Sequence, residues 1–71
     1  MGLDAEISIT VNGEPRRQAA GSVAELVRAL GLDPAKVAVE RNREIVPRST
    51  LGEVAVSDGD AFEIVHFVGG G

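Results

Sequence analysis

The chain has 71 residues, of which 44% are hydrophobic and 25% charged, and it carries a net charge of -4 and no cysteine. This length holds one small domain with a compact core, and the composition is that of a folded chain rather than a disordered one. The missing cysteines exclude disulfides, thiolate metal sites and thiol nucleophiles, which fits a reducing cytoplasm. The acidic balance disfavours general nucleic acid binding, and no apolar stretch has the length that spans a membrane.

The first segment predicts a β-hairpin. In residues 6–11, polar and apolar side chains alternate, which is typical of a strand with one buried face. Asn12 and Gly13 follow, and this pair tolerates the positive φ angles of a two-residue turn. The return strand, residues 14–19, contains Pro15 and few apolar side chains, so we expect it at an edge of the sheet.

A helix is predicted to begin at Ser22. Ser22 and Glu25 have the spacing of a capping box, in which the hydroxyl and the carboxylate each bond a free backbone N–H of the first turn. Gly31 can close the last turn in a left-handed conformation. Four apolar residues between these ends share one helix face, and they are Val23, Leu26, Val27 and Leu30.

Two further short strands are expected after the helix. Residues 37–41 and 44–46 are rich in β-branched side chains, with Asn42 and Arg43 between them as a turn and Pro47 as the end of the second strand. A partly irregular stretch then supplies apolar anchors for the core. These are Leu51, Val54 and Val56.

The last strand is expected at residues 61–68, after a turn at residues 58–60. Alternation gives this strand two distinct faces. Val65 and Phe67 share the face that we expect to point away from the helix. The other face holds Phe62, Ile64, His66 and Val68.

This order of elements favours an α+β domain with the β-grasp, or ubiquitin-like, fold. A helix between the first hairpin and the later strands can cover one face of a mixed five-stranded sheet. The first and last strands are the longest and most apolar, so they should lie centrally. We expect residues 1–68 to form this single domain and residues 69–71 to form a flexible tail.

The tail consists of Gly69, Gly70 and Gly71, directly after the last predicted strand. Residues without a Cβ atom can thread a narrow channel and present a terminal carboxylate to an enzyme. A frayed terminus is the alternative interpretation, because chain ends are often glycine-rich. We interpret the tail as the functional part of the chain.

Four segments of the chain form a recognisable set. They are Asn12-Gly13, residues 39–48, residues 58–60, and residues 63–71 with their terminal glycine pair preceded by a third glycine. Each segment is weak evidence alone. In this order and at this length they resemble the ThiS family, the small sulfur carriers of thiamine biosynthesis, and the resemblance covers the chain from Glu6 onward.

The resemblance implies a protein co-substrate that is not itself an enzyme. In the family, a ThiF-like adenylyltransferase uses ATP and Mg²⁺ to convert the terminal carboxylate, here that of Gly71, into an acyl adenylate. Sulfur from a cysteine desulfurase route then replaces AMP, and the resulting thiocarboxylate donates its sulfur to thiazole synthase. ATP and Mg²⁺ belong to the partner, because the chain has no phosphate-binding loop motif.

The candidate site residues are few, and we expect neither a catalytic residue nor a metal site. Val65 and Phe67 are expected to form a docking patch that acidic residues such as Glu63 steer to a basic partner; packing against a loop is the alternative. His66 lacks ligands at suitable spacing and is expected to pack in its strand, and Ser22 is explained by its cap. Five arginines are expected to be solvated surface charges, and they are Arg16, Arg17, Arg41, Arg43 and Arg48.

Three other functions are compatible with the same fold. A molybdopterin-synthase sulfur carrier would share the tail and its activation, although residues 40–42, Glu-Arg-Asn, and the short length favour the thiamine branch. A ubiquitin-like modifier would link Gly71 to lysines of target proteins, and a β-grasp binding module would never be activated. The fold alone does not separate these functions. We expect the free chain to be a monomer.

Overall fold

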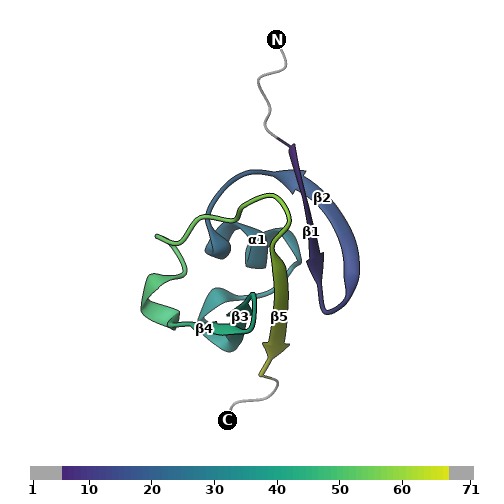
Figure 1. Ribbon diagram of the computed structural model, residues 1–71. Helices are drawn as coiled ribbons and strands as arrows, with labels where there is room; N and C mark the ends of the chain where they lie inside the picture. Colours follow the sequence, from purple (N-terminus) through teal and green to yellow (C-terminus); the bar gives the residue numbers. More distant parts are fainter. Residues whose placement is uncertain (1–5, 68–71) are drawn as a thin grey trace.

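A computed structural model describes residues 6–67 of the chain, and the predicted glycine tail lies outside these residues. Within this range, five strands form one sheet and the helix α1 packs on one of its faces (Figure 1). The elements are β1 (Glu6–Val11), β2 (Glu14–Ala19), α1 (Val23–Ala29), the 3-10 helix η1 (Pro34–Lys36), β3 (Val37–Arg41), β4 (Glu44–Val46), the 3-10 helix η2 (Arg48–Thr50) and β5 (Ala61–His66).

The first hairpin forms as its sequence predicts. β1 and β2 pair antiparallel around Asn12 and Gly13, whose φ angles of 51° and 84° are both left-handed. These angles match the right-handed twist of the flanking strands. β2 has β1 as its one neighbour in the sheet, so the prediction of an edge strand is confirmed.

The strand order is β2-β1-β5-β3-β4, which places β5 at the centre and β1 beside it. β1 and β5 run parallel, whereas the β3–β5 and β3–β4 pairs are antiparallel. The central position of β1 and β5 confirms the prediction from their length and apolar content. The domain therefore has the β-grasp fold that the order of elements indicated.

The helix begins and ends at the predicted signals. The backbone N–H of Glu25 donates to the Ser22 hydroxyl at 3.1 Å, and the backbone N–H of Ser22 donates to the Glu25 carboxylate at 2.8 Å. This capping box satisfies two N–H groups that the helix itself leaves free. Beyond the helix, Gly31 has a φ of 82°, a left-handed angle that a side chain would disfavour.

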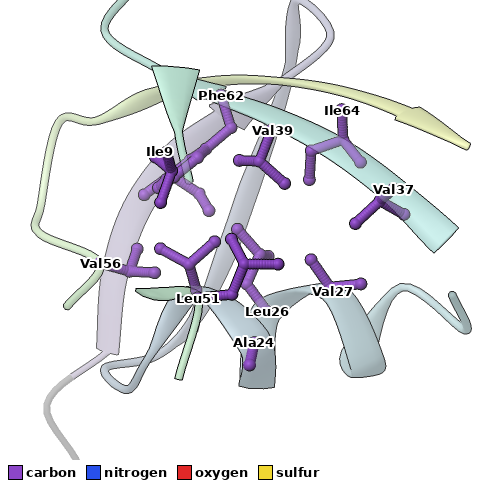
Figure 2. Close-up of a cluster of buried hydrophobic side chains, with 12 residues drawn as sticks. Ile9, Ala24, Leu26, Val27, Val37, Val39, Leu51, Val56, Phe62 and Ile64 are labelled. Carbon is purple, nitrogen blue, oxygen red and sulfur yellow. The ribbon is translucent and has the colours of Figure 1, made fainter. Parts of the chain in front are cut away.

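The core lies between α1 and the inner face of the sheet. Figure 2 shows that helix side chains, among them Leu26, point toward Phe62 and other residues of the central strands. Leu51 and Val56 close the side of this cluster from the segment between β4 and β5. Full burial of such a side chain contributes about 1.5–3 kcal/mol, so these contacts hold the helix on the sheet.

The structure departs from the sequence predictions in its connections. The expected exit loop after the helix contains η1, and the expected irregular stretch after β4 begins with η2. β5 ends at His66, so Phe67 is not part of the strand, and residue 68, the limit of the predicted strand, lies outside the described residues. No helix within residues 6–67 combines the length and the apolar composition needed to cross a membrane.

Candidate functional site

The outer face of the sheet, opposite α1, carries exposed apolar side chains. Across the antiparallel β3–β5 pair, Ala38 lies opposite Val65. Across the β3–β4 pair, Glu40 lies opposite Ile45. Side chains directly opposite each other share a face, and the alternate residues of β3 and β5 are buried in the core. Strand pairing therefore brings these four residues together on the outer face.

These strands enclose a shallow groove of about 240 Å³. We name it the apolar groove and define it by Ala38, Ile45, Pro47 and Val65, with Glu40, Glu63 and Arg48 also lining it. Ile45 is 77% exposed, Val65 60% and Phe67 45%, and these three are the exposed large hydrophobic residues of the described chain. Single exposed apolar side chains are common on protein surfaces, whereas these three lie on the same face of the sheet.

Phe67 extends this surface past the end of β5. Its backbone N–H donates to the carbonyl of Lys36 at 2.8 Å, which continues the β3–β5 pairing by one residue. The guanidinium carbon of Arg48 lies 5.8 Å from the centre of the Phe67 ring, within the range of a cation–π interaction. Arg48 thus covers part of the ring and connects Phe67 to the apolar groove.

One buried carboxylate fixes the turn before β5. Asp60 is 6% exposed. It accepts hydrogen bonds from Nε of Arg41 at 2.8 Å, from Nδ2 of Asn42 at 3.0 Å and from the backbone N–H of Ser57 at 2.8 Å. Burial by itself raises the pKa of Asp60, but these hydrogen bonds, led by that of Arg41, together with the guanidinium charge hold the pKa below its ordinary value. Asp60 therefore ties the start of β5 to the β3–β4 turn as an ionised group.

Two asparagines hold β5 through their side chains. The Asn12 Oδ1 accepts from the N–H of Ile64 at 2.8 Å, and its Nδ2 donates to the carbonyl of the same residue at 3.2 Å. The Asn42 Oδ1 accepts from the N–H of Ala61 at 3.0 Å. Each side chain thus replaces a backbone partner where a neighbouring strand has already turned away. These contacts orient β5 and so hold Val65 on the outer face.

The two predicted docking residues lie on the face of the sheet that the alternation of the last strand predicted. Val65 and Phe67 are exposed on the face away from α1, and their role in docking stays a prediction. Gly69, Gly70 and Gly71 lie outside the described residues. His66 differs from its expectation, because it is exposed at the last position of β5 rather than packed in the core.

Metal binding has no visible basis in the described part of the chain. Among residues 6–67, no group of three or more His, Cys, Asp or Glu side chains is arranged to hold a metal ion. The hydroxyl of Ser22 accepts the helix-capping hydrogen bond that the sequence predicted.

Sequence reasoning missed three contributors to this region. Ile45 was not a candidate, because a three-residue strand does not reveal which of its apolar side chains faces outward. The expectation of a solvated charge is wrong for Arg41, which pairs with Asp60. Arg48 is exposed as expected, but its contact with Phe67 was not foreseen. The resemblance included these arginines, but no spacing rule links them to their distant partners.

Comparisons with known proteins agree with this architecture. The sequence model of the ThiS family matches residues 9–71. The sulfur carrier protein ThiS of Bacillus subtilis is 45% identical over 51 residues, which cover 72% of this chain and 77% of that protein. The crystal structure of the thiamine biosynthesis protein ThiS from Geobacter metallireducens superimposes with a TM-score of 0.76 and 38% identity, covering 92% of this chain and 100% of that one.

A longer type of relative also contains a similar region. A thiazole synthase of Paramagnetospirillum magneticum is 53% identical over 66 residues, or 92% of this chain. The chain spans 20% of the length of the thiazole synthases that it matches. The family match, in contrast, runs from β1 to the last glycine, and the Bacillus protein is covered over most of its length. The chain belongs to the ThiS family.

Proposed function

We propose that the chain is a sulfur carrier for the thiazole part of thiamine. The observation that carries this proposal is the family match over residues 9–71, which includes both the β-grasp domain and the glycine tail. The apolar groove supports it, because a carrier that performs no chemistry of its own needs a surface that partner proteins recognise. The chain then acts as a co-substrate, and its partners supply the catalytic groups.

The chemistry centres on the carboxylate of Gly71. An ionised carboxylate is a poor electrophile, since attack would add charge to an anion. In the proposed first step, one carboxylate oxygen attacks the α-phosphate of ATP, pyrophosphate leaves, and an acyl adenylate forms. A hydrosulfide-level donor then adds to the same carbonyl carbon, AMP leaves with the electrons of the broken C–O bond, and a thiocarboxylate remains. If the donor is a persulfide from a cysteine desulfurase route, a thiol reduces the S–S bond of the product.

The proposed partners follow from this sequence of steps. A ThiF-like adenylyltransferase binds ATP and Mg²⁺, and the chain itself binds neither. Thiazole synthase is the proposed acceptor of the sulfur, which the occurrence of a similar region inside proteins of that name supports. We place the free chain in the cytoplasm as a monomer that binds neither nucleic acid nor membranes.

Whole-protein mass spectrometry tests the proposal. The chain ending at Gly71 is incubated with a ThiF-like enzyme, ATP, Mg²⁺ and sulfide, and one oxygen should be replaced by sulfur. A variant that lacks Gly71 should keep its circular dichroism spectrum and its unfolding midpoint but gain no sulfur, because the deletion removes the end of the tail and no core residue. An unchanged mass of the intact chain, with an enzyme active on another carrier, would refute the proposal. Conjugates linked to other proteins would identify a modifier instead.

A further inference from the structure

Two carboxylates meet on the outer face in an arrangement that does not stabilise the free domain. Glu40 and Glu63 lie directly opposite each other across β3 and β5, and both side chains are exposed. Neither carboxylate takes part in an ion pair with another residue of the 6–67 range. Like charges directly opposite in an antiparallel pair are destabilising. A cation presented by a binding partner would relieve this repulsion.

The charges give the apolar groove a direction along β5. Glu63, Val65 and Phe67 follow each other at every second residue on the outer face, so the series covers about 13 Å. The two carboxylates lie at its beginning, the apolar side chains lie in its middle, and Arg48 lies over Phe67 at its end. The chain continues from Phe67 into the tail, so the acidic end of the series is the one distant from the tail's origin.

We propose that the apolar groove binds a protein surface that presents one bulky apolar side chain beside an arginine or lysine. Charge complementarity supports this occupant. Directly opposite side chains have Cβ atoms about 4.5–5.5 Å apart, so a single guanidinium can bond both Glu40 and Glu63. The apolar side chain then fills the space between Ile45 and Val65. Resting on the proposed function, this partner is the adenylating enzyme.

The groove's polarity orients this partner. With its cation at the carboxylate end, the partner extends over Val65 toward Arg48, which is the end from which the tail starts. The reverse orientation places the partner's cation against Arg48 and leaves the two carboxylates unpaired. Electrostatic complementarity of this kind sets binding register and association rate more than it sets total affinity.

The test compares two charge-matched double variants. In Glu40→Gln/Glu63→Gln the groove loses both carboxylates, whereas Glu14→Gln/Glu53→Gln removes two exposed carboxylates that do not line it. Dissociation constants for a ThiF-like enzyme are measured at low and at physiological salt, together with the KM of the carrier in ATP–pyrophosphate exchange. The groove variant should bind about tenfold more weakly at low salt and lose most of its salt dependence, while its unfolding midpoint stays equal or rises. The control variant should stay within about twofold of the wild type.

The outcomes separate the two proposals. If the wild type gains sulfur and the groove variant binds as tightly as the control, the docking proposal is refuted and the carrier function stands. If the wild type gains no sulfur but its binding depends on Glu40 and Glu63, the carrier function is refuted and the docking proposal stands. A wild type that neither binds nor gains sulfur refutes both. Loss of affinity with an equal loss of stability also refutes the docking proposal.

Discussion

Replacing Asp60 by alanine tests whether one buried carboxylate organises the centre of the sheet. The change removes three hydrogen bonds at once, two from neutral amide groups and one from the Arg41 guanidinium. About 1 kcal/mol for each neutral bond and about 1.5–2 kcal/mol for the charged one give a loss of about 3.5–4 kcal/mol. The lower charged value applies because the Arg41 side chain is 33% exposed. A domain of this size has a total stability of roughly 4–10 kcal/mol, so the substitution should remove at least about a third of the free energy of unfolding.

Urea unfolding followed by far-ultraviolet circular dichroism measures this loss, because the chain has neither Trp nor Tyr for fluorescence. Asp58→Ala in the same turn is the matched control. Asp58 is exposed and accepts one hydrogen bond, from the N–H of Ser8 at 2.7 Å, so its loss should be about 0.5–1 kcal/mol. Equal effects of the two substitutions would refute the reasoning from burial.

The same carboxylate predicts how stability depends on pH. The pKa of Asp60 lies below its ordinary value of 3.8 in the folded protein. The ionised Asp60 therefore makes its full contribution to the free energy of unfolding at pH values above 3.8, and this contribution is lost as the pH falls through the pKa of the folded state. Asp60→Asn should be less stable than the wild type at neutral pH, and the difference should shrink as the pH falls below about 4. A difference that stays constant down to acid unfolding would contradict the assigned pKa shift.

Five other substitutions, at four positions, probe the fold and the groove. Arg43→Gly should stabilise the domain by about 0.5–1 kcal/mol in urea unfolding, because Arg43 has a left-handed φ of 71°; a loss of stability would mean that its side chain makes a needed contact. Asn12→Ala should lower the free energy of unfolding by about 2–3 kcal/mol, since two hydrogen bonds to Ile64 disappear. Asn12→Gly should lower it nearly as much, because glycine accepts the left-handed turn but lacks the side chain; a much smaller effect of glycine would assign the loss to backbone strain. Leu26→Ala, at a position with no exposure, should lose about 2–5 kcal/mol, and a smaller loss would indicate that the core relaxes. Phe67→Ala should lower stability by no more than about 1 kcal/mol yet raise the KM for adenylation several-fold, whereas equal effects on both would identify a packing residue.

Local signals determined most of the fold. The Asn12-Gly13 turn, the Ser22 capping box and the left-handed position at Gly31 each depend on neighbours a few residues away, so the sequence shows them directly. Alternation in the last strand correctly assigned Val65 and Phe67 to the outer face, because a strand period of two needs no knowledge of the partner strand. The order of the five strands and the helix, and the fold class, follow from these patterns alone.

The candidate site was visible only in part. The exposed side chain of Ile45 went unnoticed because β4 has three residues, too few for alternation to decide which face is buried. His66 was expected to pack because its face is the core face, but the core cluster does not include it at the end of β5. A side chain that points to the core face is still exposed where the packed core ends, and the alternation of the sequence does not show where that is.

By itself, the sequence determined the elements, the buried face of the last strand and membership in a recognisable family. Only the tertiary structure decided that Asp60 pairs with Arg41, that Arg48 lies over Phe67, and that Glu40 faces Glu63. The physical reason is that these contacts join residues 19 to 23 positions apart in the chain. The register between β3 and β5 sets the Glu40–Glu63 pair, whereas Asp60 and Arg48 lie in connecting segments that the assembled sheet brings to their partners. Strand pairing is a non-local property, so the direction of the apolar groove emerges only when the sheet is assembled.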